Sequence, residues 1–271
     1  MLKISHPANA MSGVPRENAF LVLDEAGLKC GSASVIEYYN DILLPDRPLN
    51  YYINISAMTE RAFDMMIGAV IARSMELHSF QPDIPGRIYV PCRPDDRQTL
   101  FALLSYGFQN DDGEFRMRRM LGPNNRIIPP PVGCLVAPVL MENEEDGQDL
   151  LHRVNRHSPT ARSMEWLYRL QQEQMFLVLG VWQNNMLLGE LILTAFGTEG
   201  RIEFLYTADT YRNRGVAISL ITHAAEILRD RGIHSINAVV WRRNVPATTL
   251  FQSMQFENVG PMVLYPGINL G

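Results

Sequence analysis

The sequence predicts an α/β (α+β) fold with two tandem domains, each a mixed, mostly antiparallel central sheet flanked by helices. Strand-like and helix-like hydrophobic periods follow one another in the same order in both halves of the chain. A proline-rich stretch separates the two series. The 271 residues, 46% hydrophobic and 20% charged, suffice for one large or two ordinary globular domains.

Composition and charge argue against several classes of protein. A net charge of −5 argues against general binding to nucleic acid or to an anionic membrane. Three widely spaced cysteines (Cys30, Cys92 and Cys134) indicate no disulfide framework and favour a reducing compartment. No signal-like apolar run, membrane-length span or metal-ligand spacing stands out. We therefore expect a cytoplasmic protein without a metal and without nucleic-acid or membrane partners.

The first domain is expected to span residues 1–121. Its predicted order is strand, strand, strand, long helix, strand, short helix, strand. The long helix rests on apolar residues that recur at the helical period between residues 63 and 75. The predicted strands are 18–24, 30–39, 49–55, 87–91 and 116–121, and the predicted helices are 59–77 and a short one around 100–104.

Residues 122–133 are expected to be the linker, because three successive prolines favour an extended, stiff spacer. The second domain is expected at 134–271. Its predicted strands are 135–141, 175–182, 186–196, 201–207 and 234–241, with a turn at 183–185. Its predicted helices are 149–155, 163–172, a long one that stops at Gly232, and a short one after Asn244.

The two halves look like an internal duplication, because the order of their elements repeats. Asp96 and Thr99 fall where Asn244 and Ala247 fall in the second half. The pair 107–108 (Gly-Phe) likewise corresponds to the pair 255–256 (Gln-Phe).

The loop at residues 211–217, between a strand and the long helix, is the strongest candidate for a binding site. Small residues at Gly215 and Ala217 let backbone approach a ligand closely. The first N–H groups of a helix lack intrahelical partners and favour phosphate, and Arg212 and Arg214 add positive charge. The alternative is an ordinary strand-to-helix connection. The first half has no glycine at the equivalent turn and carries Glu60, so no phosphate cradle is expected there.

This loop, followed by Asn244-x-x-Ala247, Phe251 and Phe256, resembles the Gcn5-related N-acetyltransferase family over roughly the last half of the chain. The resemblance implies acetyl-CoA as the cofactor. It also implies a bulge that separates the strand at 201–207 from the next strand. The residues it assigns to cofactor binding are Leu205, Tyr206 and Thr207 along the pantetheine arm, Arg212, Asn213, Arg214, Gly215, Val216 and Ala217 around the pyrophosphate, and Asn244 and Phe251.

Glu203 is the candidate general base, because a carboxylate on a central strand is costly unless it has a use or a partner. Alternation predicts that Glu203 and Leu205 share one face of the strand. A salt bridge with a nearby arginine is the alternative. The family often has Tyr where this chain has Phe251, which cannot donate a proton, so Tyr265 or water is the candidate acid.

The resemblance implies an N-acetyltransferase that moves an acetyl group from acetyl-CoA to a primary amine of a small molecule or peptide by direct attack. Because Phe251 cannot donate a proton, a second hypothesis is a non-catalytic protein that binds or senses acyl-CoA. The sequence does not indicate which amine is the acceptor. For the oligomeric state, either a monomer or a homodimer is expected.

Overall fold

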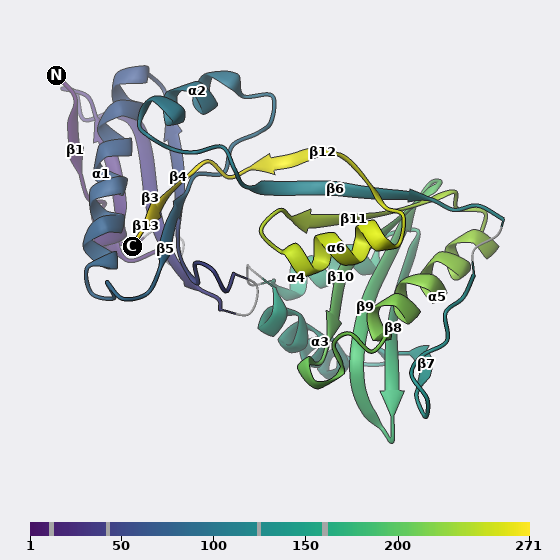
Figure 1. The fold of residues 1–271 in the computed structure, drawn as a ribbon. Helices are drawn as coiled ribbons and strands as arrows, with labels where there is room; N and C mark the ends of the chain where they lie inside the picture. The colour runs from purple at the N-terminus through teal and green to yellow at the C-terminus, as the bar shows by residue number, and fades with distance from the viewer. Residues whose placement is uncertain (11–13, 42–43, 124–125, 159–161) are drawn as a thin grey trace. The chain divides into compact units, whose positions relative to one another are not determined.

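The computed structural model describes residues 1–10, 14–41, 44–123, 126–158 and 162–271. The chain divides into two compact units (Figure 1). The first unit comprises Met1–Glu114 with Pro261–Gly271, and the second comprises Phe115–Gly260. Each unit is built on one mixed sheet with helices beside it, which confirms the predicted fold class.

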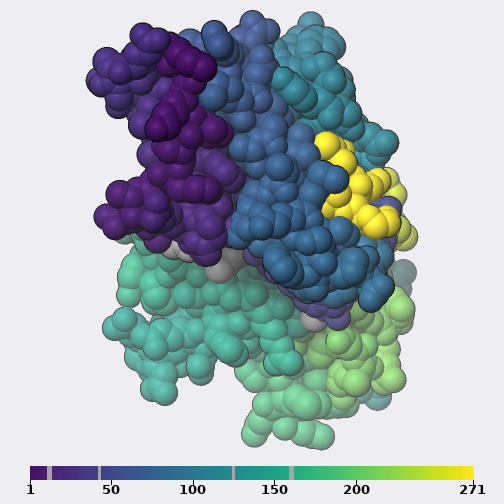
Figure 2. Space-filling model, turned by 90° about the vertical axis from the view of Figure 1, so that its left-hand side faces the viewer, coloured from purple at the N-terminus to yellow at the C-terminus, as the bar shows by residue number. Residues whose placement is uncertain are grey.

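The first unit has a six-stranded sheet in the order β1-β2-β3-β4-β5-β13. Its helix α1 packs on β2, β3 and β4 through a core that includes Tyr51, Met66 and Val70. Figure 2 shows the yellow C-terminal strand beside blue segments of this unit, as the pairing of β13 with β5 requires. The elements are β1 (Lys3–Ser5), β2 (Ala19–Leu23), β3 (Lys29–Tyr39), β4 (Leu49–Ala57), α1 (Glu60–His78), β5 (Gly86–Tyr89), α2 (Arg97–Ser105) and β13 (Gly267–Leu270).

The second unit has a seven-stranded sheet in the order β12-β6-β11-β10-β9-β8-β7. One core packs α5 on the sheet, and a separate core packs α3 and α4 on it through residues such as Leu150 and Phe204. The strands are β6 (Gly113–Met120), β7 (Leu135–Pro138), β8 (Met175–Gln183), β9 (Met186–Phe196), β10 (Glu199–Thr207), β11 (Ser235–Trp241) and β12 (Glu257–Leu264). The helices are α3 (Glu144–His157), α4 (Met164–Gln171), α5 (Val216–Asp230) and α6 (Val245–Ser253).

The two halves of the chain exchange strands. The segment expected to close the first sheet, β6, instead lies between β11 and β12 in the second sheet. In return, β13 pairs with β5 and completes the first sheet. The sequence predicts β6 as a strand but not the edge on which it pairs, and it did not predict β13. The expected domain boundaries, 1–121 and 134–271, stay a prediction about the two copies. The compact units follow different boundaries, because each sheet contains a strand from the other half of the chain.

The short helices α2 and α6 begin in the same way, which supports the internal duplication. Asp96 Oδ1 accepts a hydrogen bond from the Thr99 amide at 3.0 Å, and Asn244 Oδ1 accepts one from the Ala247 amide at 3.2 Å. The backbone angles of the two capping residues nearly coincide, at φ −82°, ψ 72° and φ −77°, ψ 72°. Asn244 therefore caps α6, and asparagine is one of the residues that favour this position.

These helices also end alike. The amide of Phe108 bonds to the carbonyl of Leu103, and that of Phe256 bonds to the carbonyl of Phe251. The residue before each phenylalanine has a positive φ, 87° at Gly107 and 64° at Gln255. The left-handed conformation suits glycine and strains most other residues, so Gln255 holds a position made for glycine.

Three local features refine the expected elements. The turn at 183–185 is confirmed, with φ of 48° at Asn184 and 64° at Asn185, the positive values of a tight hairpin. Helix α3 begins earlier than expected, because Asn143 and Asp146 form a capping box. The segment 126–133 contains no helix or strand, and the Ile128 amide donates to Thr222 Oγ1 on α5 at 3.1 Å.

Candidate active site

Strands β10 and β11 part midway along the sheet of the second unit. Their parallel pairing runs only from Glu199 to Ile202 on β10, against Ser235 to Ala238 on β11. On its other side, β10 stays paired with β9 as far as Thr207. The β11-facing backbone of the end of β10, which includes Leu205, Tyr206 and Thr207, therefore has no partner strand. Unpaired backbone groups of this kind can hydrogen-bond an extended ligand.

The loop before α5 leaves the start of this helix open. Gly215 caps the helix with φ 86° and no side-chain cap, and Asn213 also has a positive φ of 59°. A Cβ on Gly215 would meet no atom within 4 Å, so the space before the helix is open. The first amides of α5, at Val216 and Ala217, lack intrahelical partners by position and attract an anion together with the helix dipole.

Two arginines of this loop are held by neighbours. Arg212 Nη2 lies 2.9 Å from Asp209 Oδ1 in an exposed ion pair. The Arg214 guanidinium lies 5.4 Å from the centroid of the Tyr211 ring. The Tyr211 hydroxyl donates to Gln183 Oε1 at 2.9 Å. These contacts anchor the loop on the hairpin turn and keep positive charge at the start of α5.

Glu203 lies at the point where the two strands part. A bulge between Ile202 and Phe204 shifts the register of β10 against β9 there. Glu203 Oε1 accepts a hydrogen bond from Thr194 Oγ1 at 2.7 Å. Arg201 Nη1 is 3.9 Å from the same oxygen, a loose ion pair, and the Glu203 side chain is 21% exposed. The arrangement leaves the carboxylate anchored but accessible.

The expectation that Glu203 shares a face with Leu205 is wrong. Leu205 packs against the core beneath α5, whereas Phe204 packs with Ile192 in the core beneath α3 and α4. Alternation along β9 puts Thr194, the partner of Glu203, on the face of Ile192. The bulge adds one residue to β10 and so moves Glu203 to the α3 and α4 face.

The structure adds a cluster that the sequence did not reveal. Glu190 of β9 is fully buried and receives two hydrogen bonds from Arg153, from Nε to Oε2 at 3.0 Å and from Nη2 to Oε1 at 2.9 Å. Glu190 pairs in register with Tyr206 of β10. The His157 ring stacks on Tyr206 with centroids 4.2 Å apart. The cluster connects α3 to the free end of β10.

Burial sets the protonation of this cluster. It raises the pKa of Glu190, although the Arg153 guanidinium opposes the shift. Burial also lowers the pKa of His157, and the nearby charge of Arg156 lowers it further. A neutral imidazole at neutral pH can accept a proton. The spacing of Arg153 and His157, four residues apart on a helix, and a lone carboxylate in an apolar strand were the signals available in the sequence.

Two of the expected site residues are engaged in contacts of their own. Phe251 is 4% exposed and packs edge-on against Phe256 in the core beneath α5, so its expected contact with the cofactor stays a prediction. Tyr265 belongs to the first unit, where its hydroxyl donates to Glu114 Oε1 at 2.9 Å and burial raises its pKa. The second unit, which holds β10 and the loop before α5, does not contain Tyr265. The role of Tyr265 as the acid therefore stays a prediction.

Two kinds of feature are absent from the described part of the chain. Among those residues, no three His, Cys, Asp or Glu side chains gather as metal ligands. No helix there has the length and apolar character needed to cross a membrane.

Comparison with solved structures indicates a shared fold. The chain matches a GCN5-related N-acetyltransferase from Sphaerobacter thermophilus with a TM-score of 0.53 and 14% identity, over 96% of this chain and 83% of the other. A GCN5-related N-acetyltransferase from Anabaena variabilis gives 0.55 and 12%, over 98% and 72%. A probable N-acyltransferase from Enterococcus faecalis gives 0.58 and 11%, over 91% and 61%. At these identities the likeness concerns the fold.

Comparison of sequences finds a family likeness in the second half of the chain. Among curated proteins, no sequence matches the chain. The model of the acetyltransferase (GNAT) family matches residues 142–256, which contain the bulge of β10, the loop before α5 and the cap of α6. Residues 142–256 of this chain are therefore similar in sequence to the acetyltransferase (GNAT) family.

Proposed function

We propose that the second unit transfers an acetyl group from acetyl-CoA to a primary amine of a small molecule or peptide. The observation that carries the proposal is the parting of β10 from β11 beside the uncapped start of α5. A free strand edge suits the amides of a pantetheine arm, and a free helix start suits a pyrophosphate. The two features together match both ends of one ligand.

The residues present fit acetyl-CoA. The pyrophosphate would meet the amides of Gly215, Val216 and Ala217, and a side chain at Gly215 would project into the open space before them. Arg212 and Arg214 would add positive charge there, Asn213 would shape the loop, and Asn244 and Phe251 are the remaining proposed contacts. When bound, acetyl-CoA supplies a thioester carbonyl that a neutral amine can attack directly.

The amine must be neutral before it can attack, and Glu203 is the proposed base. Its carboxylate is held by Thr194 and remains accessible, so it can take a proton directly or through water. His157 is a second candidate, since burial favours its neutral form. The arginine contact considered for Glu203 exists, but at 3.9 Å it leaves the carboxylate free to act. Water is the proposed acid in the second unit, because the other expected donor, Tyr265, belongs to the first unit, where its hydroxyl donates to Glu114.

We also propose the class of acceptor, the location and the oligomeric state. The acceptor would be a small-molecule amine or a peptide, with no nucleic-acid or membrane partner, and the net charge of −5 supports this. A cytoplasmic location and a monomeric or homodimeric state complete it.

A non-catalytic protein that binds or senses acyl-CoA is the second candidate, because Phe251 offers no proton at the place where the family often has Tyr. Thiol release from acetyl-CoA, measured with a panel of primary amines, distinguishes the two functions. The proposed enzyme releases thiol only when a suitable amine is present. Tight acetyl-CoA binding without thiol release for any small amine or peptide N-terminus would favour the sensor.

A further inference from the structure

A largely buried ion pair joins Arg153 of α3 to Glu190 of β9. The Glu190 side chain is fully buried, and that of Arg153 is 30% exposed. Glu190 accepts two hydrogen bonds from the guanidinium, at 3.0 Å from Nε and at 2.9 Å from Nη2. Apolar side chains of similar size often stabilise a fold as well as such a pair does, because removing two charges from water is costly. The pair is therefore better suited to fixing one arrangement of α3 on β9 than to adding stability.

The ion pair fixes α3 beside the free end of β10. Glu190 pairs in register with Tyr206, so both side chains stand on the face that α3 and α4 cover. His157 follows Arg153 by four residues and lies on the same side of α3. Its ring stacks on the Tyr206 ring with centroids 4.2 Å apart and an interplanar angle of 15°, an arrangement called the His157–Tyr206 stack below.

The first unit provides an internal comparison, because β3 and β4 correspond to β9 and β10 in the order of elements. Gly31 of β3 corresponds to Gly189 of β9. An added Cβ at either glycine would lie 2.6 Å from a side chain of the following long helix and 2.9 Å from a carbonyl oxygen of the adjacent strand. The same close approach of strand and helix therefore aligns the two copies at these positions.

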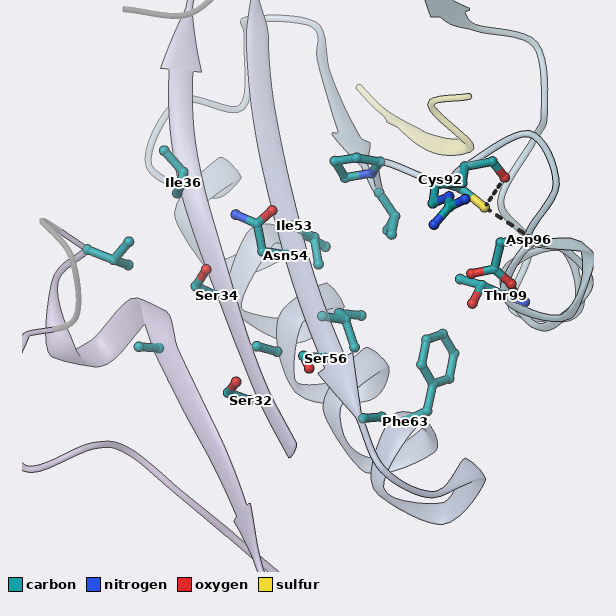
Figure 3. A pocket seen from close by; sticks show the side chains of 18 residues that line it. Ser32, Ser34, Ile36, Ile53, Asn54, Ser56, Phe63, Cys92, Asp96 and Thr99 are labelled. Atoms are coloured by element: carbon teal, nitrogen blue, oxygen red, sulfur yellow. Dashed lines mark hydrogen bonds between the residues drawn. The ribbon is translucent and has the colours of Figure 1, made fainter. Parts of the chain in front are cut away.

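At the next position the copies differ. The second unit has Glu190 paired with Tyr206, whereas the first unit has Ser32 paired with Ser56. These serines belong to a cavity of about 680 Å³, and Figure 3 shows both among the side chains that line it. Among the described residues of the first unit, no α-helix precedes β3, whereas α3 and α4 precede β9. The ion pair and the stack therefore belong to the copy that has the glycine loop before its long helix.

The stack borders the face on which the amine of the proposed reaction must lie. Glu203, the proposed base, stands on the α3 and α4 face of β10. Tyr206 follows it by three residues, about 10 Å along the strand. Both rings of the stack belong to half-buried residues. An acceptor that reaches Glu203 along this face passes the stacked rings.

We propose that Arg153 and Glu190 are positioning residues, whose ion pair holds the His157–Tyr206 stack as a fixed wall that orients the acceptor amine. This role rests on the proposed acetyl transfer, since it needs an amine beside the stack. The amine has to lie within bonding reach of the thioester carbon. A displaced wall therefore lowers the rate of transfer more than it lowers the affinity for acetyl-CoA.

The double variant Arg153→Met with Glu190→Met separates a positioning role from a structural one. It leaves no unpaired buried charge, so its free energy of unfolding in urea should equal or exceed that of the wild type. The His157 imidazole protons, which stacking on Tyr206 shifts upfield in the proton NMR spectrum, should return toward the positions of an unstacked histidine. His157→Gln identifies these signals, because it removes them.

Thiol release with the panel of primary amines gives the second readout. In the double variant, kcat/KM for the amine should fall at least about tenfold, whereas the Kd for acetyl-CoA stays within about threefold of the wild-type value. Arg153→Lys keeps the charge but loses the planar fork of two donors. This conservative variant should retain part of the upfield shift and part of the rate.

Arg118→Met with Glu199→Met is the matched control. Arg118 Nη2 lies 2.7 Å from Glu199 Oε1 in an ion pair of the same unit, which joins β6 to β10 through side chains that are 32% and 44% exposed. Its loss should leave the His157 signals and kcat/KM unchanged.

A folded double variant with wild-type His157 signals and wild-type kcat/KM would overturn the proposal. Loss of activity only in parallel with loss of stability, or equal losses in the control, would also overturn it. Failure of the proposed acetyl transfer is seen separately, as thiol release from no amine of the panel. The NMR signals then still decide whether the ion pair holds the stack, because unchanged signals contradict that role and displaced signals support it.

Discussion

Glu203 is the residue on which the proposed chemistry depends most. It lies at the bulge of β10, accepts a hydrogen bond from Thr194 and keeps 21% of its side chain exposed. Sequence alternation alone assigned its side chain to the wrong face, because a bulge of one residue cannot be seen in a hydrophobic pattern. The structure therefore changes which elements surround the carboxylate, from α5 to α3 and α4.

Replacing Glu203 by Gln should lower kcat by roughly 10²-fold, while the affinity for acetyl-CoA changes little. The amide keeps the size of the side chain but cannot accept the proton. Steady-state kinetics against pH, with titration of acetyl-CoA, measures both effects, and the low-pH limb of the rate profile should disappear. Thr194→Val is the control that loses the hydrogen bond but keeps the carboxylate. A Gln variant with the wild-type kcat and pH profile would make Glu203 structural.

His157 should make the protein less stable in acid. Its pKa is lowered in the folded state by burial, with Arg156 and Arg212 acting in the same direction and Asp209 against it. The unfolded chain then binds the proton more readily, so the stability present above the ordinary histidine pKa is lost as the pH falls through the folded value.

His157→Gln should therefore lose less unfolding free energy than the wild type between about pH 7.5 and about pH 5. Urea unfolding at the two pH values measures the difference. His152→Gln, at an exposed position of the same helix, is the matched control and should behave as the wild type. Equal acid sensitivity in the His157 variant and the wild type would show that this group does not carry the effect.

Among the elements, the hydrophobic periods predicted most helices and strands, and Asn244 predicted the start of α6. The start of α2 after Asp96 lies earlier than the predicted short helix around 100–104. The loop before α5 was also readable, since glycine at a positive φ before a helix leaves a sequence signature. The sequence signals for the cluster around Glu190 did not join its members, because the contact between Arg153 and Glu190 depends on how α3 packs on β9.

The equivalent ends of α2 and α6 give a prediction about stability. Gln255 holds a left-handed conformation that Gly107 holds in the other copy. Gln255→Gly should raise the free energy of unfolding of the second unit by about 1 kcal/mol, because it removes the strain of a side chain at positive φ. Gly107→Ala is the reciprocal variant and should destabilise the first unit by a similar amount. Denaturant unfolding measures both, and a destabilising Gln255→Gly would contradict the strain argument.

At the scale of the whole molecule, the sequence predicted two similar domains but not the exchange of strands between them. β6 was predicted as a strand, whereas residues 267–270 (β13) were not among the predicted strands, and the partners of both are set by which sheet edges are open when the chain folds. The cavity in the first unit was not expected for the same reason, because a hydrophobic pattern predicts strands but not how far neighbouring strands stay paired. The sequence there lacks the phosphate loop, whereas the parting of β4 from β5 is a property of backbone pairing.

The exchange predicts that the C-terminus stabilises the first unit. Deleting residues 266–271 removes β13, unpairs one edge of β5 and removes Leu270, which is 8% exposed, from the core. Hydrogen exchange should then become faster in β4 and β5, while β8 and β9 of the second unit stay protected. Unchanged protection of β5 in the truncated chain would show that β13 contributes little to this sheet.

Calorimetric titration of acetyl-CoA with two glycine variants tests whether the start of α5 binds the pyrophosphate. Gly215 and Gly232 lie at opposite ends of α5, both have positive φ (86° and 74°), and an added Cβ meets no atom within 4 Å at either. Glutamate at each position therefore introduces similar strain and the same charge. Gly215→Glu should weaken acetyl-CoA binding by about 100-fold or more through charge repulsion and occupied space, whereas Gly232→Glu should bind as the wild type does. Wild-type affinity in a folded Gly215→Glu protein, or equal losses in both variants, would contradict the claim.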